Sequence, residues 1–312
     1  MKDFFLRLTR FTLHLALVVI LVCVAMRIFL HTDFHEPVIR SKGASTIILG
    51  DSHTEFGLVA DSIGEAFNFS NGSERYVLNL KKLQALSEVY PIKRVILSLS
   101  YHSFIDFSPG EGQEEQGFYY RYCFTLYPFI RPVEKLRCLE LFGYSEMPEA
   151  MLCHEIGFPP PNSLALIEHK LRGNPFLFTP SKEIAPLPID WESRINLHFY
   201  GRDTSDLRKV NSSFVTGIWD IRSFCEEKGY KLVLFNAPVS QSYYAHIPPV
   251  YKQLTDSIVN LLVDNRTTYY VDYTQYPLPD SCFWDGDHTN LYGANIITPL
   301  LRDSLRALGI LP

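Results

Sequence analysis

Short β-branched runs alternate with longer amphipathic stretches along most of this chain, and this alternation strongly limits the folds open to it. Five runs have the length and residue types of buried strands: Thr46–Leu49, Ala66–Ser70, Arg94–Ser100, Lys231–Asn236 and Tyr269–Asp272. Helical patterns mark three longer stretches: Glu74–Val89, Ser205–Glu227 and Leu291–Leu308. A further helix is expected after the first strand, at about Thr54–Phe67. Because strands joined by helices form parallel sheets, we expect an α/β fold with a parallel sheet.

One region between the third and fourth strands breaks the alternation. Residues 103–203 are rich in Pro, Phe and Tyr and are too numerous for a plain loop. We expect an inserted cap subdomain, which leaves the sheet at the carboxyl end of a strand, where open α/β sheets bind ligands. Its aromatic side chains fit either a substrate groove or a small hydrophobic core.

The N-terminal segment differs in kind from the rest, because Phe11–Met26 contains no charged residue. Together with its apolar flanks, this stretch approaches the length that crosses a bilayer. Lys2, Arg7 and Arg10 precede it, so the positive-inside rule places the N-terminus in the cytoplasm and the rest of the chain across the membrane. A cleaved signal peptide is the alternative, but no small-x-small cleavage site follows the apolar core.

We therefore expect three parts along the chain. Residues 1–31 form a cytoplasmic stub and a single transmembrane anchor, residues 32–43 a linker, and residues 44–312 the main domain with its insertion. The main domain is expected outside the cytoplasm, either in the periplasm or at the cell surface.

Charge and cysteine content exclude some classes of partner and site. The formal net charge is −5, and no stretch rich in Lys and Arg is interleaved with aromatic residues, so we exclude nucleic acid as a partner. A disulfide, if one forms among the five cysteines beyond the anchor, is best placed among Cys123, Cys138 and Cys153. Because no Cys/His cluster has zinc spacing, we expect neither a metal nor another cofactor.

Two short segments at opposite ends of the chain carry the residue types of a serine catalytic site. The first, Gly50-Asp51-Ser52, directly follows the first predicted strand, so Ser52 would lie at the carboxyl edge of the sheet. The backbone N–H of Ser52 and the N-terminus of the following helix would then face a developing oxyanion. The alternative is a turn in which Ser52 or Asp51 only caps that helix.

The second segment is Asp285-Gly286-Asp287-His288, between the last predicted strand and the last helix. A spacing of three places Asp285 and His288 on one side of a helical turn, where the carboxylate can orient the imidazole. Asp287 should point elsewhere and serve turn geometry or cap the helix that begins near Asn290. Asp-x-x-His alone also fits a surface turn. Because this segment is expected at the same sheet edge as Ser52, the two segments together predict a serine nucleophile, a histidine base and an aspartate that orients the base.

These blocks resemble the first and last blocks of the SGNH, or GDSL-type, hydrolases over roughly Thr46–Leu308, apart from the insertion. The resemblance implies a flavodoxin-like three-layer α/β/α sandwich with Ser52 as nucleophile, His288 as base and Asp285 as its orienter. Members of this family hydrolyse or transfer acyl groups on esters, including acetyl groups on glycans.

The two middle blocks match the family less well. Its oxyanion glycine follows the second strand, where Gly72 is the candidate and Asn71 a neighbouring one. Its Gly-x-Asn-Asp block after the third strand is replaced by Ser98-Leu99-Ser100-Tyr101-His102-Ser103, so the asparagine donor is missing. His102 either replaces that donor or is a packing or surface histidine.

Three functional hypotheses follow. The first is an anchored serine esterase or O-acyltransferase that acts on an acylated cell-envelope glycan or another ester, together with an envelope-biosynthesis partner protein. The second is an inactive SGNH-like module that binds glycan or assists envelope assembly, as the missing asparagine suggests. The third is a metallophosphoesterase built on His53, Asp285, Asp287 and His288, although two-metal sites need more ligands.

Overall fold

A computed structural model describes residues 2–40, 43–88, 90–105, 189–201 and 206–312 of the chain. Helix α1 and the domain that begins at Ser41 belong to separate compact units, and each is described by itself. Most of the predicted cap subdomain lies outside the described residues, and so do Cys123, Cys138 and Cys153. The remaining cysteines, which the structure does describe, are free thiols: Cys23, Cys225 and Cys282.

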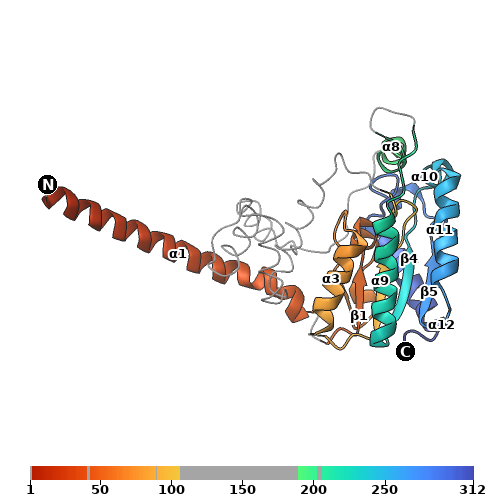
Figure 1. Ribbon diagram of the computed structural model, residues 1–312, viewed down its shortest axis with the longest axis horizontal. Coiled ribbons are helices and arrows are strands. Elements are labelled where there is room, and N and C mark those ends of the chain that lie inside the picture. Colours follow the sequence, from red (N-terminus) through yellow and green to blue (C-terminus); the bar gives the residue numbers. More distant parts are fainter. Residues whose placement is uncertain (1, 41–42, 89, 106–188, 202–205) are drawn as a thin grey trace. The chain divides into compact units, whose positions relative to one another are not determined.

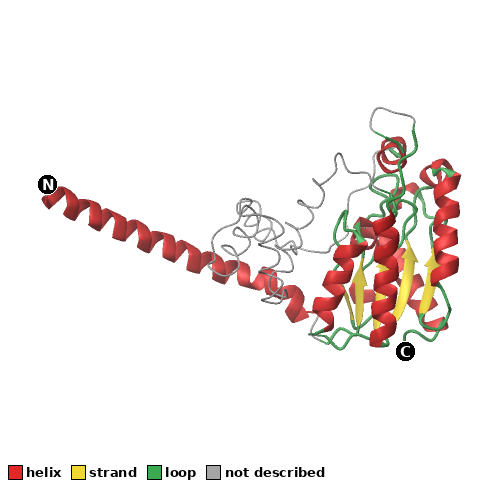
Figure 2. Cartoon of the chain, viewed as in Figure 1, coloured by secondary structure: helices red, strands yellow, loops and turns green. Residues whose placement is uncertain are grey.

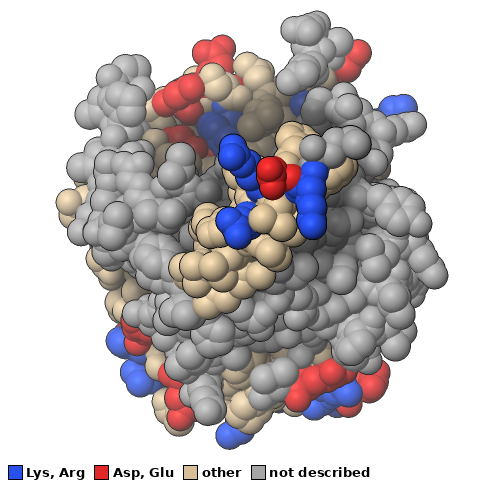
Figure 3. Space-filling view, turned by 90° about the vertical axis from the view of Figure 1, so that its left-hand side faces the viewer, with Lys and Arg blue, Asp and Glu red and all other residues tan. Residues whose placement is uncertain are grey.

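Helix α1 (Lys2–Arg40) contains a segment, Lys2–Ala25, whose 24 residues are long and apolar enough to cross a membrane. At about 1.5 Å per residue it exceeds the roughly 30 Å hydrocarbon core. Basic side chains gather at its N-terminal end, which faces the viewer in Figure 3. The helix continues through most of residues 32–43, where we expected a linker. An apolar helix near the N-terminus is also a property of signal sequences.

The domain is built on a five-stranded parallel sheet in the order β2-β1-β3-β4-β5, which confirms the predicted α/β class. Its strands are β1 (Thr46–Leu49), β2 (Ala66–Asn68), β3 (Arg94–Ser98), β4 (Lys231–Asn236) and β5 (Thr268–Asp272). The sheet grows from β1 toward β2 on one side and from β1 toward β3 on the other. In open α/β sheets, ligands bind outside the carboxyl ends of the strands at which the order reverses, and here these are β1 and β3.

Helices cover both faces of this sheet (Figures 1 and 2). On one face α3 (Tyr76–Ser87) packs against α9 (Ser212–Lys228), which also contacts β4. On the other face, the buried side chains of α12 (Leu291–Ala307) pack against the alternate strand residues that point to this side of the sheet, and together they form one hydrophobic cluster. Members of this cluster include Ile48, Ile96, Val233, Ile297, Leu301 and Leu305.

Several short elements complete the domain. They are α2 (Ser52–Gly57), η1 (Ala60–Ser62), α8 (Glu192–Phe199), α10 (Gln241–His246), α11 (Pro249–Leu262) and η4 (Asp280–Cys282). Helix α8 falls within the predicted insertion, yet it packs against α10 in a cluster that contains Phe199 and Tyr243. The end of the inserted region is therefore part of the domain core.

The helix predicted at Thr54–Phe67 is much shorter than expected. It ends at Gly57, after which Leu58 is extended and buried. The side-chain amide of Asn68, at the end of β2, donates to the carbonyl oxygens of Thr54 (2.8 Å) and Leu58 (3.3 Å). Because these carbonyls bond to a side chain from another element, tertiary contacts end the helix where the apolar pattern would continue it.

The helix predicted at Ser205–Glu227 begins later, at Ser212. Asn211 caps it by accepting the N–H of Ser213. Leu207 and Val210, which share the helical spacing, are instead exposed residues of isolated β-bridges. Near the other end, Gly229 adopts a left-handed conformation (φ 72°) and stops the helix.

Candidate active site

Ser52 lies at the junction of β1 and α2, and the glycine before it makes this junction possible. Gly50 has a φ of 141°, and a Cβ there would overlap Ser98 of β3, lying 2.9 Å from its backbone nitrogen. A residue without a side chain therefore lets the chain turn sharply against the neighbouring strand. Asp51 follows as the N-cap of α2, accepting the N–H of His53 (3.0 Å) and the hydroxyl of Ser98 (2.8 Å).

The structure brings the three residues of the predicted triad together. Ser52 Oγ lies 2.6 Å from His288 Nε2, across 236 positions of sequence. On the other side of the ring, His288 Nδ1 lies 2.8 Å from Asp285 Oδ2 and 3.0 Å from Oδ1. A carboxylate beside Nδ1 favours the tautomer with a proton there, which leaves the Nε2 lone pair to accept the Ser52 hydroxyl proton.

Asp285 and His288 meet through a local turn that precedes α12. Oδ1 of Asp285 accepts the backbone N–H groups of Asp287 (3.0 Å) and His288 (2.8 Å), which folds the carboxylate back toward the imidazole. The expected helical turn is therefore an Asx-type turn. The predicted cap by Asp287 is wrong, because Asn290 caps α12 by accepting the N–H groups of Tyr292 and Gly293.

The oxyanion candidates occupy different places. A Cβ built on Gly72 would lie 4.0 Å from the Cβ of Ser52, so Gly72 is a direct neighbour of the serine. Asn71 is held by its backbone N–H, which donates to Gly50 O (3.2 Å). His102 is buried rather than on the surface, with Nε2 at 3.7 Å from Asp51 Oδ2 and its ring stacked on His198 at 4.0 Å.

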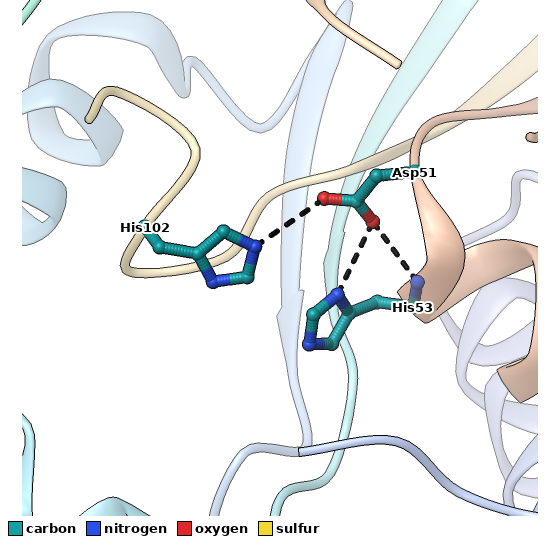
Figure 4. A group of neighbouring side chains, drawn as sticks. All are labelled: Asp51, His53 and His102. Atoms are coloured by element: carbon teal, nitrogen blue, oxygen red, sulfur yellow. Dashed lines mark hydrogen bonds and ion pairs between the residues drawn. The ribbon is translucent and has the colours of Figure 1, made fainter. Parts of the chain in front are cut away.

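His53, directly after Ser52, forms a buried bridge between two carboxylates. Its Nδ1 lies 3.3 Å from Asp51 Oδ1 and its Nε2 lies 3.3 Å from Asp287 Oδ2. Burial alone would lower the pKa of His53, but Asp51 and Asp287 outweigh it and raise this pKa to about 10. The pKa of His102, in contrast, falls to about 3 through burial and the charge of His53. Figure 4 shows each of the two rings facing one oxygen of the Asp51 carboxylate.

Asp287 is fully buried and forms an ion pair with Arg194 of α8. Nε of Arg194 lies 2.5 Å from Oδ1 and an Nη lies 3.1 Å from Oδ2, which is a bidentate arrangement. The same Nη lies 3.2 Å from His198 Nε2, and His198 Nδ1 lies 2.6 Å from the hydroxyl of Tyr243. Although burial raises the pKa of Asp287, the neighbouring His288, His198, His53 and Arg194 lower it well below its usual range.

Two overlapping groups in the described part of the chain could offer three ligand atoms to a metal ion. They are Asp51, His53 and His102 in one group and His53, Asp287 and His288 in the other, with ligand atoms within 4.8 Å of one another. Imidazole and carboxylate ligands suit zinc. In both groups, however, an ion would have to displace a proton of His53, and in the second Arg194 already neutralises Asp287.

Two aromatic rings lie close to the His288 ring. Trp284 lies 5.2 Å from the His288 ring between centroids, and Phe56 of α2 lies 5.9 Å from it. The two aromatic side chains contact each other edge to face at 5.4 Å. They form an apolar wall next to the Ser52–His288 pair.

Sequence reasoning missed Arg194 and His198 behind the triad. It named His53 and Asp287 only for a metal site or for the turn and cap before the last helix, and not as a pair that links the two segments. One signal was available, since Arg194 and His198 are four residues apart and so share a helix face. Comparison with known proteins adds no assignment: no family model matches the chain, and no curated protein sequence is significantly similar to it.

Proposed function

We propose that this protein is a membrane-anchored serine esterase or O-acyltransferase that uses Ser52, His288 and Asp285. The observation that carries the proposal is the hydrogen-bonded series from Ser52 Oγ through both nitrogens of His288 to Asp285. A serine hydroxyl needs such a base to become nucleophilic, and the base needs a carboxylate to hold its tautomer.

In the proposed reaction, Ser52 Oγ attacks the carbonyl carbon of an ester while His288 Nε2 takes its proton. The tetrahedral intermediate then collapses, and His288 returns the proton to the departing alcohol, which leaves an acyl group on Ser52. Water or a sugar hydroxyl attacks this acyl group in turn, again giving its proton to His288. Ser52 is regenerated, and the product is a carboxylic acid or a new ester.

The backbone N–H groups of Ser52 and Gly72 are our proposed oxyanion donors. The position of Gly72 beside Ser52 supports this assignment. Helix α2 has only six residues, so its dipole contributes less than the longer predicted helix would. In this scheme the contacts of His102 with Asp51 and His198 make it a supporting residue beneath the nucleophile.

The substrate class is proposed from the surroundings of the triad. The wall of Phe56 and Trp284 suits a small acyl group or the apolar face of a sugar ring. The apolar segment of α1, with basic residues at its N-terminal end, supports an anchor that holds the domain outside the cytoplasm. An acetyl-type group on a cell-envelope glycan meets both conditions, and the SGNH-like blocks are consistent with it.

The test is covalent labelling of the full-length protein in detergent with a fluorophosphonate probe, followed by hydrolysis of p-nitrophenyl acetate. We expect labelling at Ser52, and loss of labelling and hydrolysis in Ser52→Ala. Ser242→Ala, which changes an exposed serine of α10, is the matched control and should behave as wild type. Retained hydrolysis in Ser52→Ala would refute the proposal.

The inactive glycan-binding or envelope-assembly module is the second candidate, favoured by one observation. The turn after β3 offers Ser100, Tyr101 and His102 in place of the family's asparagine donor, and loss of one oxyanion donor lowers rates by about 100-fold or more. A wild-type protein that binds an acetylated glycan but never reacts at Ser52 would favour this candidate.

A further inference from the structure

Two adjacent pairs of residues join the same two segments of the chain. Ser52 bonds to His288, and the next residue, His53, pairs with Asp287, the residue before His288. One segment follows β1 and the other precedes α12, so two parallel side-chain links cross between them. The second link is buried, with 3% exposure for His53 and none for Asp287, whereas the first reaches the half-buried Ser52.

The carboxylate of Asp287 is also close to the base. Its Oδ1 lies 3.7 Å from His288 Nδ1, the atom that Asp285 holds at 2.8 Å. Two carboxylates therefore flank one ring nitrogen. A second full negative charge at this distance would favour the protonated imidazole, which cannot act as a base.

Arg194 supplies the compensating charge. It binds both oxygens of Asp287 and lies 3.6 Å from Asp285 Oδ2, so a single guanidinium stands between the two carboxylates. Its position is fixed by His198 on the next turn of α8 and, through it, by Tyr243 of α10. Gly286 lets α8 approach, since a Cβ there would lie 2.7 Å from the Cα of Trp191.

We propose that His53, Asp287 and Arg194 are positioning residues of the site, in which His53 and Asp287 lock the serine segment to the histidine segment. Arg194, from the end of the inserted region, cancels the charge of Asp287 next to His288. This inference rests on the proposed function of Ser52 and His288. It assigns a role to a helix that lies far from both segments in sequence.

Substitutions that remove the charge of Arg194 or of Asp287 should shift the pH–rate profile in opposite directions. Arg194→Gln removes the guanidinium between the two carboxylates and leaves Asp287 only the His53 cation, which it shares with Asp51. Protonation of the base is then favoured, and the acidic limb of the pH–rate profile moves to higher pH. Asp287→Asn removes one of the two carboxylates beside Arg194 and His288, and the limb moves to lower pH. For charges at these separations we expect shifts of about one pH unit or more.

The experiment measures the rate of Ser52 labelling by a fluorophosphonate against pH for wild type, both single variants and the double variant. Opposite shifts in the single variants and a near-normal profile in the double variant are expected. Arg194→Lys should give a smaller shift, because it keeps the charge and loses the bidentate geometry. Arg306→Gln, an exposed arginine of α12, is the matched control and should not shift the profile.

A purely structural role predicts a different result. If both single variants lose labelling rate without moving the acidic limb, the inference is overturned while the proposed function stands.

The groups that face His53 from its surroundings are Asp51, His102, Asp287 and His288, with Arg194 and His198 behind Asp287.

A second measurement keeps the network testable if wild type never reacts at Ser52, the result that would refute the proposed function. Imidazole nitrogen NMR of the full chain, labelled at histidine, follows protonation without any turnover. We expect His53 to lose its proton at a lower pH in Asp287→Asn than in wild type. An unchanged His53 titration in that variant would overturn the inference on its own.

Discussion

Asp285→Asn gives the sharpest single test of the triad, because the structure fixes how the new side chain would sit. Oδ1 of Asp285 accepts two backbone N–H groups, from Asp287 and His288, and this position needs an oxygen. The amide oxygen of asparagine would take it, which leaves the NH₂ group where Oδ2 now faces His288 Nδ1 at 2.8 Å.

The NH₂ group can only donate, and it would lie closer to Nδ1 (2.8 Å) than the amide oxygen (3.0 Å), so we expect Nδ1 to accept and the ring proton to move to Nε2. The nitrogen that faces Ser52 could then no longer take the hydroxyl proton. In a serine protease the corresponding substitution lowers kcat about 10⁴-fold, or about 5.4 kcal/mol at 1.36 kcal/mol per tenfold. We expect a loss of this order in Asp285→Asn.

Stability should change little in the same variant, because both backbone hydrogen bonds to position 285 are kept. Asp285→Ala is the contrast: it removes the oxygen that accepts both hydrogen bonds, at about 1 kcal/mol for each bond, and should lower the Tm by about 4–8 °C. The assays are p-nitrophenyl acetate hydrolysis and thermal unfolding of the purified full-length protein. Activity of Asp285→Asn within tenfold of wild type, with Ser52→Ala inactive, would refute the orienting role of Asp285.

Two further predictions concern stability, each measured by urea unfolding. Gly50→Ala forces a methyl group against Ser98 at a φ of 141° and should destabilise the domain by about 3 kcal/mol or more. Gly64→Ala is the control: at a φ of 82° with no atom within 4 Å, it should lower the unfolding free energy by about 1 kcal/mol. Equal losses in the two variants would contradict this prediction. The pKa of His53 is raised from 6.5 to about 10, so its contribution is complete below pH 6.5 and is lost as the pH rises toward 10. The unfolding free energy of His53→Gln should therefore fall less between about pH 7 and pH 9.5 than that of wild type, and an equal fall in both proteins would show that His53 is not protonated at neutral pH.

The strands were predictable from sequence because a buried parallel sheet leaves its pattern in local composition. β1 and β4 begin and end at the predicted residues, and the other three differ by at most two residues at one end. Each strand is short, apolar and flanked by turn residues, so the local signal and the tertiary environment agree. The Ser52–His288–Asp285 geometry was predictable for the same reason, since parallel strands deliver their following residues to one edge.

Helix ends and the buried charges were not predictable in this way. Leu207 and Val210 have helical spacing, yet they lie in a bridged segment before the Asn211 cap. Arg194 lies 93 residues before its partner Asp287, inside a region whose composition indicated only a cap. Such a pair is set by long-range packing, which local periodicity does not record.

The separation of Ser52 and His288 by 236 residues has a consequence for the order of events during synthesis. The serine segment leaves the ribosome early, whereas His288 lies between β5 and α12, which are synthesised last. Long-range contacts of this kind form late in folding. In a nascent or truncated chain Ser52 therefore lacks its hydrogen-bond partner, and the Ser52–His288 pair forms only when the final helix has docked on the sheet.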